Sequence, residues 1–276
     1  YEVTGVGYAP KGEVRADGRS FSASDDDDLR LLLVGGALCS NARLLAPEKE
    51  GGRYTVLGDP TEACLLVSAQ KAGVDLAEVE RHIPRVRELP FESRRKRMST
   101  IHQLERPLDG ATRVAFVKGA PNEVVRLSTK VRVNGEVMEM TDSLREKIMH
   151  ANDGYAEDGL RVLAVAYRPI HRDEKGVPTS VSEYTPDVIE HDLTFVGLEV
   201  MQDPPRPEVA AAVAECRRAG IRVIMITGDY GLTAVSIARK IGIVKSAHPK
   251  VFSGPELEKT SDEELRKALE GEVVFS

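Results

Sequence analysis

The pattern of apolar and polar positions divides the chain near residue 200. Before that point, short apolar runs typical of strands alternate in irregular order with helical patterns, and the predicted strands cover residues 53–57, 98–103, 113–118, 131–133 and 161–167. Asn134-Gly135, directly after the fourth of these runs, is a dipeptide typical of a tight hairpin turn. This irregular order predicts an α+β domain with a mainly antiparallel sheet over residues 1–201.

Strands and helices follow one another regularly in the second part of the chain. Strands are predicted at 193–200, 221–226 and 273–275, and helices at 207–219, 232–240 and 257–269. Ser261 and Glu264 form an internal capping pair in the last helix, and the strand at 221–226 is apolar enough to be buried. This order predicts a partial α/β, Rossmann-type segment over residues 202–276. The proline-rich join at 201–207 disfavours helix and predicts a hinge or domain border.

Composition and charge narrow the class of protein. The chain has 276 residues, enough for two domains, and its 41% hydrophobic and 30% charged residues are typical of a folded protein. A net charge of −6 argues against a nucleic-acid-binding protein. Cys39, Cys64 and Cys216 lie far apart, which favours reduced thiols over a disulfide or zinc site. The apolar stretch 31–39 is far shorter than the ~20 residues that span a bilayer, and Tyr1 is not a natural start. We therefore expect a soluble, cytosolic piece of a larger protein.

Two acidic segments predict helix starts. Ser24 precedes four aspartates, which suit the positive N-terminal end of a helix, and we interpret this run as a charged helix start rather than a metal site. Residues 59–62, DPTE, have the pattern of a capping box with Asp59 as the N-cap and Glu62 as its partner. The carboxylate of Glu62 could also accept the amino group of an adenine, and the two roles are compatible.

Two strand ends carry side chains suited to a phosphate. Lys118-Gly119 ends a predicted strand before a helix opened by Pro121; lysine suits phosphate, and glycine lets a ligand approach the backbone. The tripeptide 227–229, TGD, follows the buried-type strand, at the edge where open parallel sheets bind ligands. A surface lysine in the first case, and Asp229 capping the next helix in the second, are the structural alternatives.

The segment 90–99 combines an aromatic residue with a basic run. Phe91 can stack on a purine ring. If the segment is extended, Arg94, Lys96 and Met98 share one face, so that cationic and apolar surface line the same pocket. The alternatives are that Phe91 fills the core and that the basic run is a solvated edge that prevents strand pairing.

Taken together, the order and wording of six motifs resemble those of the P-type ATPases, most closely the calcium-pump and sodium/potassium-pump branch. The resemblance covers nearly the whole chain, and six motifs in the same order make it specific. The motifs are GDPTE (58–62), PFESRRKRMS (90–99), FVKGAPN (116–122), DGLRVLAVAYR (158–168), MQDPPRP (201–207) and IRVIMITGD (221–229).

The resemblance implies a role for each matching residue. Phe91 would stack on the adenine, and Glu62, Lys96 and Met98 would surround the base. Lys118 and Gly119 would form the back of the pocket, and Arg161 would reach the phosphates. Asp203 and Arg206 would serve the hinge and the bound nucleotide. Thr227, Gly228 and Asp229 would line a phosphorylation site with a haloacid dehalogenase-like fold.

The chain also departs from the family pattern. The DKTGT motif with the phosphorylated aspartate is absent and would precede Tyr1, and GDGxND, whose aspartates hold magnesium, would follow Ser276. Asn122 stands where the family usually has Glu. No GxxxxGK[ST] loop occurs, in agreement with a family that binds ATP without one. We therefore expect this chain to bind ATP, to hold no metal, and to be inactive alone, with Mg²⁺ needed only in the full-length parent.

The favoured function is that of an ATP-binding, cytosolic fragment of an ATP-driven cation pump, which delivers the γ-phosphate to an aspartate outside this chain. Its partners would be ATP and the rest of the pump, without nucleic acid, and copies could associate through the truncated sheet edge. A freestanding haloacid dehalogenase-like phosphatase with a large cap domain is one alternative, although its DxDx[TV] motif is missing. A non-enzymatic regulatory nucleotide-binding module is another, disfavoured by intact Phe91, Lys96 and Lys118. Calcium as the transported ion is suggested only by motif wording.

Overall fold

The computed structural model describes residues 1–5, 7–47, 49, 52–172, 174–202, 208–246 and 248–276. These residues form two compact units. The first contains Tyr1–Arg145 and Leu163–Glu199, and the second contains Glu146–Val162 and Val200–Ser276. Each unit has its own sheet, and the domain border expected after residue 201 stays a prediction.

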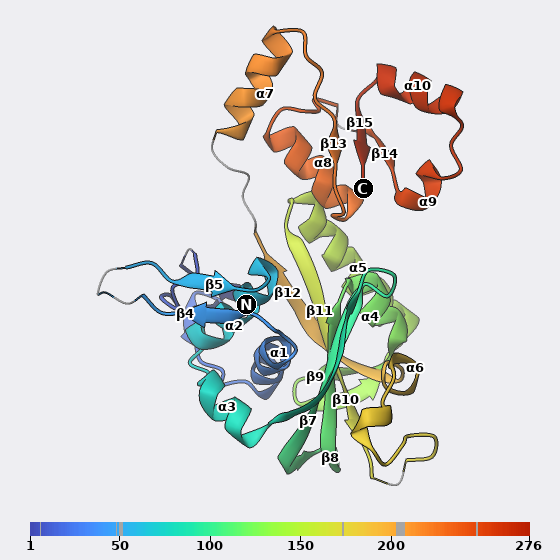
Figure 1. The fold of residues 1–276 in the computed structure, drawn as a ribbon. Helices are drawn as coiled ribbons and strands as arrows, with labels where there is room; N and C mark the ends of the chain where they lie inside the picture. Colours follow the sequence, from blue (N-terminus) through green and yellow to red (C-terminus); the bar gives the residue numbers. More distant parts are fainter. Residues whose placement is uncertain (6, 48, 50–51, 173, 203–207, 247) are drawn as a thin grey trace. The chain divides into compact units, whose positions relative to one another are not determined.

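Among the described residues, seven strands form the large sheet of the first unit, in the order β10-β9-β12-β11-β8-β7-β6 (Figure 1). The neighbours β6–β7, β7–β8, β8–β11 and β9–β10 are antiparallel, and β9–β12 is parallel. The mainly antiparallel α+β fold is therefore confirmed. The strands are β6 (Arg85–Glu92), β7 (Arg97–Leu108), β8 (Ala111–Gly119), β9 (Ser128–Val133), β10 (Glu136–Glu139), β11 (Arg161–Ile170) and β12 (Leu193–Met201).

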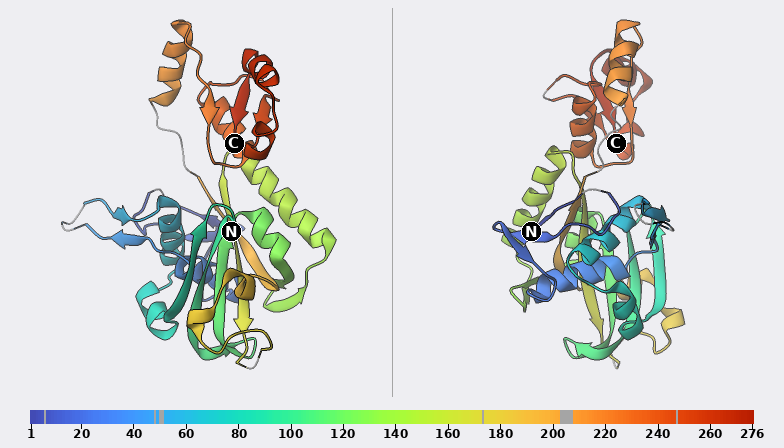
Figure 2. Two further views of the ribbon diagram at one scale, coloured as in Figure 1. Left: turned by 45° about the vertical axis from the view of Figure 1, so that its right-hand side comes forward. Right: turned by 90° about the vertical axis from the view of Figure 1, so that its left-hand side faces the viewer.

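Side chains of the central strands are buried on both faces of this sheet because successive residues of a strand point to opposite sides. Phe116 of β8 packs in the core that contains α1 (Asp27–Leu38), α2 (Pro60–Lys71) and α3 (Leu76–His82). Its neighbour Ala115 packs in the opposite core. Figures 1 and 2 show α1, α2 and α3 together on one side of the sheet.

Short elements complete the first unit. The second core lies under η1 (Val181–Glu183) and α6 (Pro186–Ile189). Pro121 opens α4 (Pro121–Leu127) as expected. Two small antiparallel sheets are formed by β1 (Glu2–Val3), β2 (Val14–Ala16) and β3 (Arg19–Phe21), and by β4 (Arg43–Leu45) and β5 (Thr55–Leu57).

The second unit contains a small parallel sheet in the order β13-β15-β14. Its strands are β13 (Met225–Ile226), β14 (Lys250–Phe252) and β15 (Val273–Phe275), and its helices are α7 (Val209–Arg218), α8 (Gly231–Lys240), α9 (Gly254–Leu257) and α10 (Asp262–Glu270). The helix α5 (Asp142–Glu157) crosses the division between the units. The alternation of strands and helices agrees with the α/β segment predicted for this part of the chain.

The predicted buried strand at 221–226 is wrong in length and in burial. Only Met225 and Ile226 are in β13, and the side chains of Ile221 and Ile226 are 59% and 80% exposed. The physical reason is that β13 pairs with β15 on one side, while no described strand lies on the other. An apolar strand is buried only where neighbouring elements cover it.

The start of α1 differs from its prediction. Its N-cap is Asp26 rather than Ser24, because the Asp26 side chain accepts hydrogen bonds from the amides of Asp28 and Leu29. The hairpin at Asn134-Gly135 is confirmed, and both residues have a positive φ, 52° and 82°, as a tight hairpin turn requires.

The predicted helix at 257–269 is also corrected, because it is two helices. A capping box between the side chains and backbones of Ser261 and Glu264 starts α10 and separates it from α9. The capping pair was therefore identified correctly, but it begins a helix instead of lying inside one.

Candidate functional site

A buried ion pair lies at the end of β8. Lys118 is 5% exposed, and its Nζ lies 2.7 Å from Oε1 of Glu62 and donates to Oγ of Ser40 at 2.9 Å. Met98 is the direct cross-strand neighbour of Lys118 and is itself 2% exposed. A buried ammonium group is stabilised by a carboxylate that faces it. The lysine expected to end a strand is therefore no surface residue.

Glu62 connects three segments of the chain. Its Oε2 accepts hydrogen bonds from the amides of Asn41 at 2.7 Å and Ala42 at 3.1 Å, while Oε1 faces Lys118. These contacts hold the chain that follows α1 against the start of α2. The predicted capping box is therefore wrong for Glu62, since Asp59 alone caps α2, through the amide of Thr61 at 2.7 Å.

The basic run forms the turn between β6 and β7. Residues 93–96 form a turn, and Lys96 has φ 51°. The predicted extended segment is thus wrong, because the hairpin reverses the chain there. Arg94 and Lys96 are exposed, whereas Met98 belongs to the core. Phe91, next to the turn, is 61% exposed and therefore no core residue.

Gly119 brings this turn against the end of β8. A Cβ at this position would lie 2.5 Å from both the Lys96 carbonyl oxygen and the Arg97 Cβ, so a side chain does not fit. The amide of Ala120 also donates to the Lys96 carbonyl at 2.9 Å. The structure thus places the hairpin with Phe91 and Lys96 beside the strand end that carries the Lys118–Glu62 pair.

The arrangement combines three chemical features. The ring of Phe91 offers an exposed aromatic face, Lys96 adds an exposed cation, and the Lys118–Glu62 pair supplies a donor and an acceptor behind them. Such a site can stack on a planar ring and attract an anionic group.

Three polar residues of this region were missed in the sequence. Ser40 and Asn41 lie just after α1, and only the Cys39-Ser40-Asn41 break in the apolar pattern marks them. Glu199 of β12 has no sequence signal, because a glutamate in a strand usually faces solvent. Its Oε2 accepts from Oγ of Ser68 at 3.2 Å, and its Oε1 has no hydrogen-bond partner among the described residues. Burial raises the pKa of Glu199 to about 8, against the opposing influence of Ser68 and the Lys118 charge.

The predicted phosphorylation-site residues lie in the second unit. Asp229 forms an ion pair with Arg161, and its amide donates to Oγ1 of Thr227 at 3.1 Å. The amide of Thr227 donates to the Phe275 carbonyl at 2.9 Å, which fixes the tripeptide beside β15. Asp229 does not cap α8, whose N-cap is Tyr230. Residues 203 and 206, the predicted Asp203 and Arg206 contacts, lie outside the described residues.

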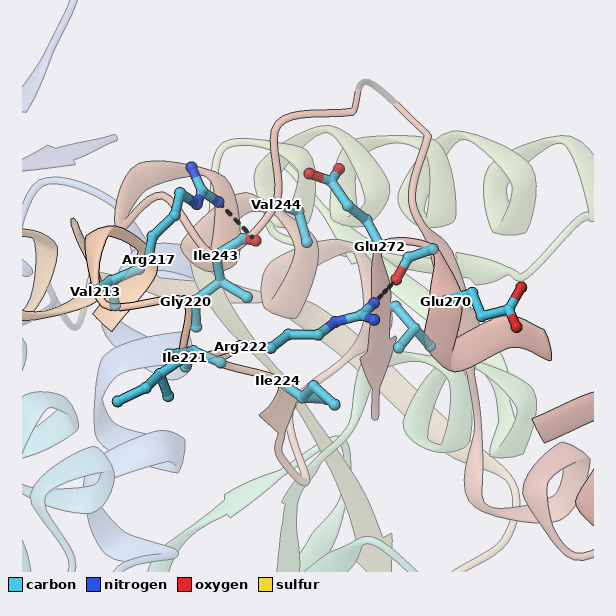
Figure 3. A pocket seen from close by; sticks show the side chains of 13 residues that line it. Val213, Arg217, Gly220, Ile221, Arg222, Ile224, Ile243, Val244, Glu270 and Glu272 are labelled. Atoms are coloured by element: carbon cyan, nitrogen blue, oxygen red, sulfur yellow. Dashed lines mark hydrogen bonds between the residues drawn. The ribbon is translucent and has the colours of Figure 1, made fainter. Parts of the chain in front are cut away.

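A pocket of 410 Å³ also lies in the second unit (Figure 3). Arg222 donates to the Gly271 carbonyl across it, and Arg217 donates to the Ile243 carbonyl at 3.4 Å, as Figure 3 shows. Arg217 also donates to the Gly242 carbonyl at 2.7 Å. None of the described residues that line it belongs to the predicted site. In the part of the chain that the structure describes, no helix has the length and apolarity needed to cross a membrane. The same part contains no group of three or more His, Cys, Asp or Glu side chains placed to hold a metal ion.

Comparison with known proteins identifies the family. Residues 28–208 match the family model of the P-type ATPase cytoplasmic domain N, and residues 156–271 match that of the haloacid dehalogenase-like hydrolases. The chain is 35% identical to a calcium-transporting ATPase of Bacillus subtilis over 100% of its own length and 29% of the relative. It is 37% identical to calcium-transporting ATPase 1 of Lactococcus lactis, over 90% of its own length and 26% of the relative. It is 36% identical to a cation-transporting ATPase of Synechocystis, over 100% of its own length and 29% of the relative. The chain thus spans less than a third of these relatives, and it belongs to the P-type ATPase family.

Proposed function

We propose that this chain binds ATP at the end of the large sheet, with the adenine on Phe91. One juxtaposition supports the proposal: the contacts of Gly119 set the hairpin of Phe91 and Lys96 beside the buried Lys118–Glu62 pair. Stacking of a base on an aromatic side chain contributes about 1–3 kcal/mol. Lys96 and Lys118 favour an anionic ligand, and Glu62 keeps lone pairs for the amino group of the base, because a carboxylate has about four acceptor positions. Met98, the buried cross-strand neighbour of Lys118, supports the site from the core.

In the whole protein, ATP held by residues 1–201 would deliver its γ-phosphate to an aspartate outside this chain, in an ATP-driven cation pump. The names of the relatives support this role, since they are calcium- and cation-transporting ATPases. Thr227, Gly228 and Asp229 would line the phosphorylation site, and Arg161, which pairs with Asp229, would reach the phosphates. Asp203 and Arg206 would serve the hinge and the nucleotide. We expect any Mg²⁺ of the whole protein to be held by parts of the pump outside this chain.

The test is a titration of ATP against the whole chain without magnesium, by isothermal calorimetry and NMR shifts. Phe91→Ala should weaken binding roughly 5- to 150-fold, the factor that corresponds to a stacking contribution of ~1–3 kcal/mol. Adenosine should lose about the same factor, because both ligands use the same base contact. Lys96→Ala should weaken ATP more than adenosine.

Tyr155→Ala is the matched control, since Tyr155 is also a partly exposed aromatic residue, 41% exposed, outside the site. It should leave the affinity unchanged. Undiminished ATP affinity in Phe91→Ala, with the fold intact by circular dichroism, would remove Phe91 from the site and overturn the proposal. Binding by the chain accompanied by steady phosphate release that is lost in Asp229→Asn would instead favour a phosphatase.

A further inference from the structure

The position of Phe91 is not fixed by its own packing. Its side chain is 61% exposed, and the pairing of β6 with β7 is irregular between Leu89 and Glu92. An exposed ring on an irregular strand end loses conformational freedom when it stacks on a ligand, and this loss weakens binding unless the ring is held in advance. Whatever holds the backbone on both sides of Phe91 therefore influences how well it binds.

Arg95 holds both sides. Its Nη2 donates to the carbonyl oxygen of Pro90 at 2.7 Å, and its Nε donates to Oε2 of Glu92 at 2.9 Å. Pro90 and Glu92 are the residues directly before and after Phe91. The guanidinium group is planar with donors in fixed directions, so two contacts made together fix the bend of the segment. The Arg95 side chain is only 16% exposed, although its contacts to Pro90 and Glu92 lie at the surface.

Glu190 holds Arg95 in turn. Its side chain is fully buried, and both of its oxygens accept from Nη1 of Arg95, at 2.6 and 2.7 Å. Nε of Arg97 donates to the same carboxylate at 2.7 Å, and Oγ of Ser99 donates to it as well. A buried carboxylate is stable only with such a full set of partners. The basic run is therefore divided: Arg95 and Arg97 turn inward to Glu190, while Arg94 and Lys96 are exposed.

We infer that Glu190 and Arg95 are positioning residues for the nucleotide base, because they hold the Phe91 segment in its binding conformation. Arg95 contacts this segment directly, and Glu190, more than ninety residues away in the sequence, holds Arg95. The inference rests on the proposed binding of ATP at Phe91. Neither residue touches the base in this account. Their effect passes through the Pro90 carbonyl and the Glu92 side chain, on either side of Phe91, and it therefore depends on the ring of Phe91.

The test is a double-mutant cycle on ATP and adenosine affinity in the whole chain. Arg95→Lys keeps the charge beside Glu190 but cannot bridge Pro90 and Glu92, and it should weaken both ligands about fivefold, part of the stacking contribution. In the Phe91→Ala background the same change should have no further effect, because the ring is absent. Arg218→Lys is the matched control, because Arg218 is an exposed arginine of α7, with a side chain 77% exposed, and it should leave the affinity unchanged.

A second variant guards against unfolding of the first. Glu92→Ala removes the contact between Arg95 and the Glu92 carboxylate. Because the Glu92 side chain is 57% exposed, this change should weaken binding of both ligands and leave the melting temperature nearly unchanged. Equal losses from Arg95→Lys with and without Phe91 would overturn the positioning role while the proposed ATP site stands. Unchanged affinity in both Arg95→Lys and Glu92→Ala, with Phe91→Ala still weakened, would do the same. Unchanged affinity in Phe91→Ala would overturn the site and the inference together.

Discussion

The strands β8 and β13 show how differently two apolar sequences can be placed. β8 has nine residues, pairs with β7 on one side and β11 on the other, and buries Val114, Phe116 and Val117 almost completely. β13 has two residues and, among the described strands, pairs only with β15, and Ile226 is 80% exposed. The difference lies in the neighbours of each strand, since both sequences are equally suited to burial.

An apolar strand without a second neighbour leaves backbone groups and side chains available to another strand. Association of copies through the β13 edge therefore stays a prediction, which size-exclusion chromatography over a range of concentrations would test. A concentration-independent monomer would show that this edge does not recruit a second chain.

The largest expected effect compares one core residue with one exposed residue. Phe116→Ala should destabilise the first unit by about 3–5 kcal/mol, because it removes a buried ring between α1 and the sheet. Ile226→Ala should change the stability of the second unit by at most about 0.5 kcal/mol, because little of its side chain is covered. Urea denaturation followed by circular dichroism and hydrogen exchange would measure both.

Val117→Ala is a useful second core variant, since Val117 is fully buried on the opposite face of β8. The destabilisation caused by Val117→Ala should lie between those of Phe116→Ala and Ile226→Ala, and nearer to that of Phe116→Ala. A cost at Ile226 as large as that at Phe116 would contradict the comparison, because it would mean that β13 is covered in solution.

The same comparison explains what the sequence predicted well. The central strands and the hairpin at Asn134-Gly135 follow from local patterns that the tertiary structure reinforces. The prediction of a buried strand at 221–226 was wrong because burial depends on segments distant in sequence, which a local pattern does not contain. The N-cap of α1 was displaced by two residues because Ser24 and Asp26 are both good caps, and only the backbone geometry selects Asp26.

Within the candidate site, the motifs predict which residues take part, whereas the contacts between these residues come from the structure. Lys118, Glu62 and Gly119 were all named in advance, yet the pairing of Glu62 with Lys118 joins residues 56 positions apart. The inward turn of Arg95 toward Glu190 and the burial of Glu199 likewise depend on segments distant in sequence. The local sequence shows which chemical groups are present, whereas the fold determines which of these groups contact one another.

The next effect in size concerns the buried carboxyl of Glu199 in the well-covered unit. Burial raises its pKa to about 8 in the folded chain, from the ordinary value of 4.5 for a glutamate. Between these two values the folded state keeps a proton that the unfolded state has lost, so stability falls as pH rises. Glu199→Gln removes this dependence, and it should match wild type near pH 4.5 and be more stable by on the order of 4 kcal/mol at pH 8.

Urea denaturation at pH 5 and pH 8 would measure this difference. Glu139→Gln is the matched control, because Glu139 lies on the same sheet in the exposed strand β10. It should show no growing advantage with pH. An advantage of Glu199→Gln that stays constant between the two pH values would mean that Glu199 is ionised in the folded chain.

The smallest effect compares two helix caps that serve helices of unequal burial. Ser261 caps α10, in which no residue is fully buried, and Asp59 caps α2, in which six residues are buried. Removing either cap by alanine should cost about 0.5–2 kcal/mol. The loss should be visible in different places, because α2 has buried residues in the core of its unit, whereas α10 contributes only partly buried side chains to the small cluster of Phe252, Val273 and Phe275. Hydrogen exchange in Ser261→Ala should therefore quicken in α10 alone, while Asp59→Ala should lower the protection of the whole first unit without separate opening of α2. Faster exchange throughout the second unit in Ser261→Ala would show that α10 is integral to its core, and the contrast between the two units would then lie in the exposed edge at β13 alone.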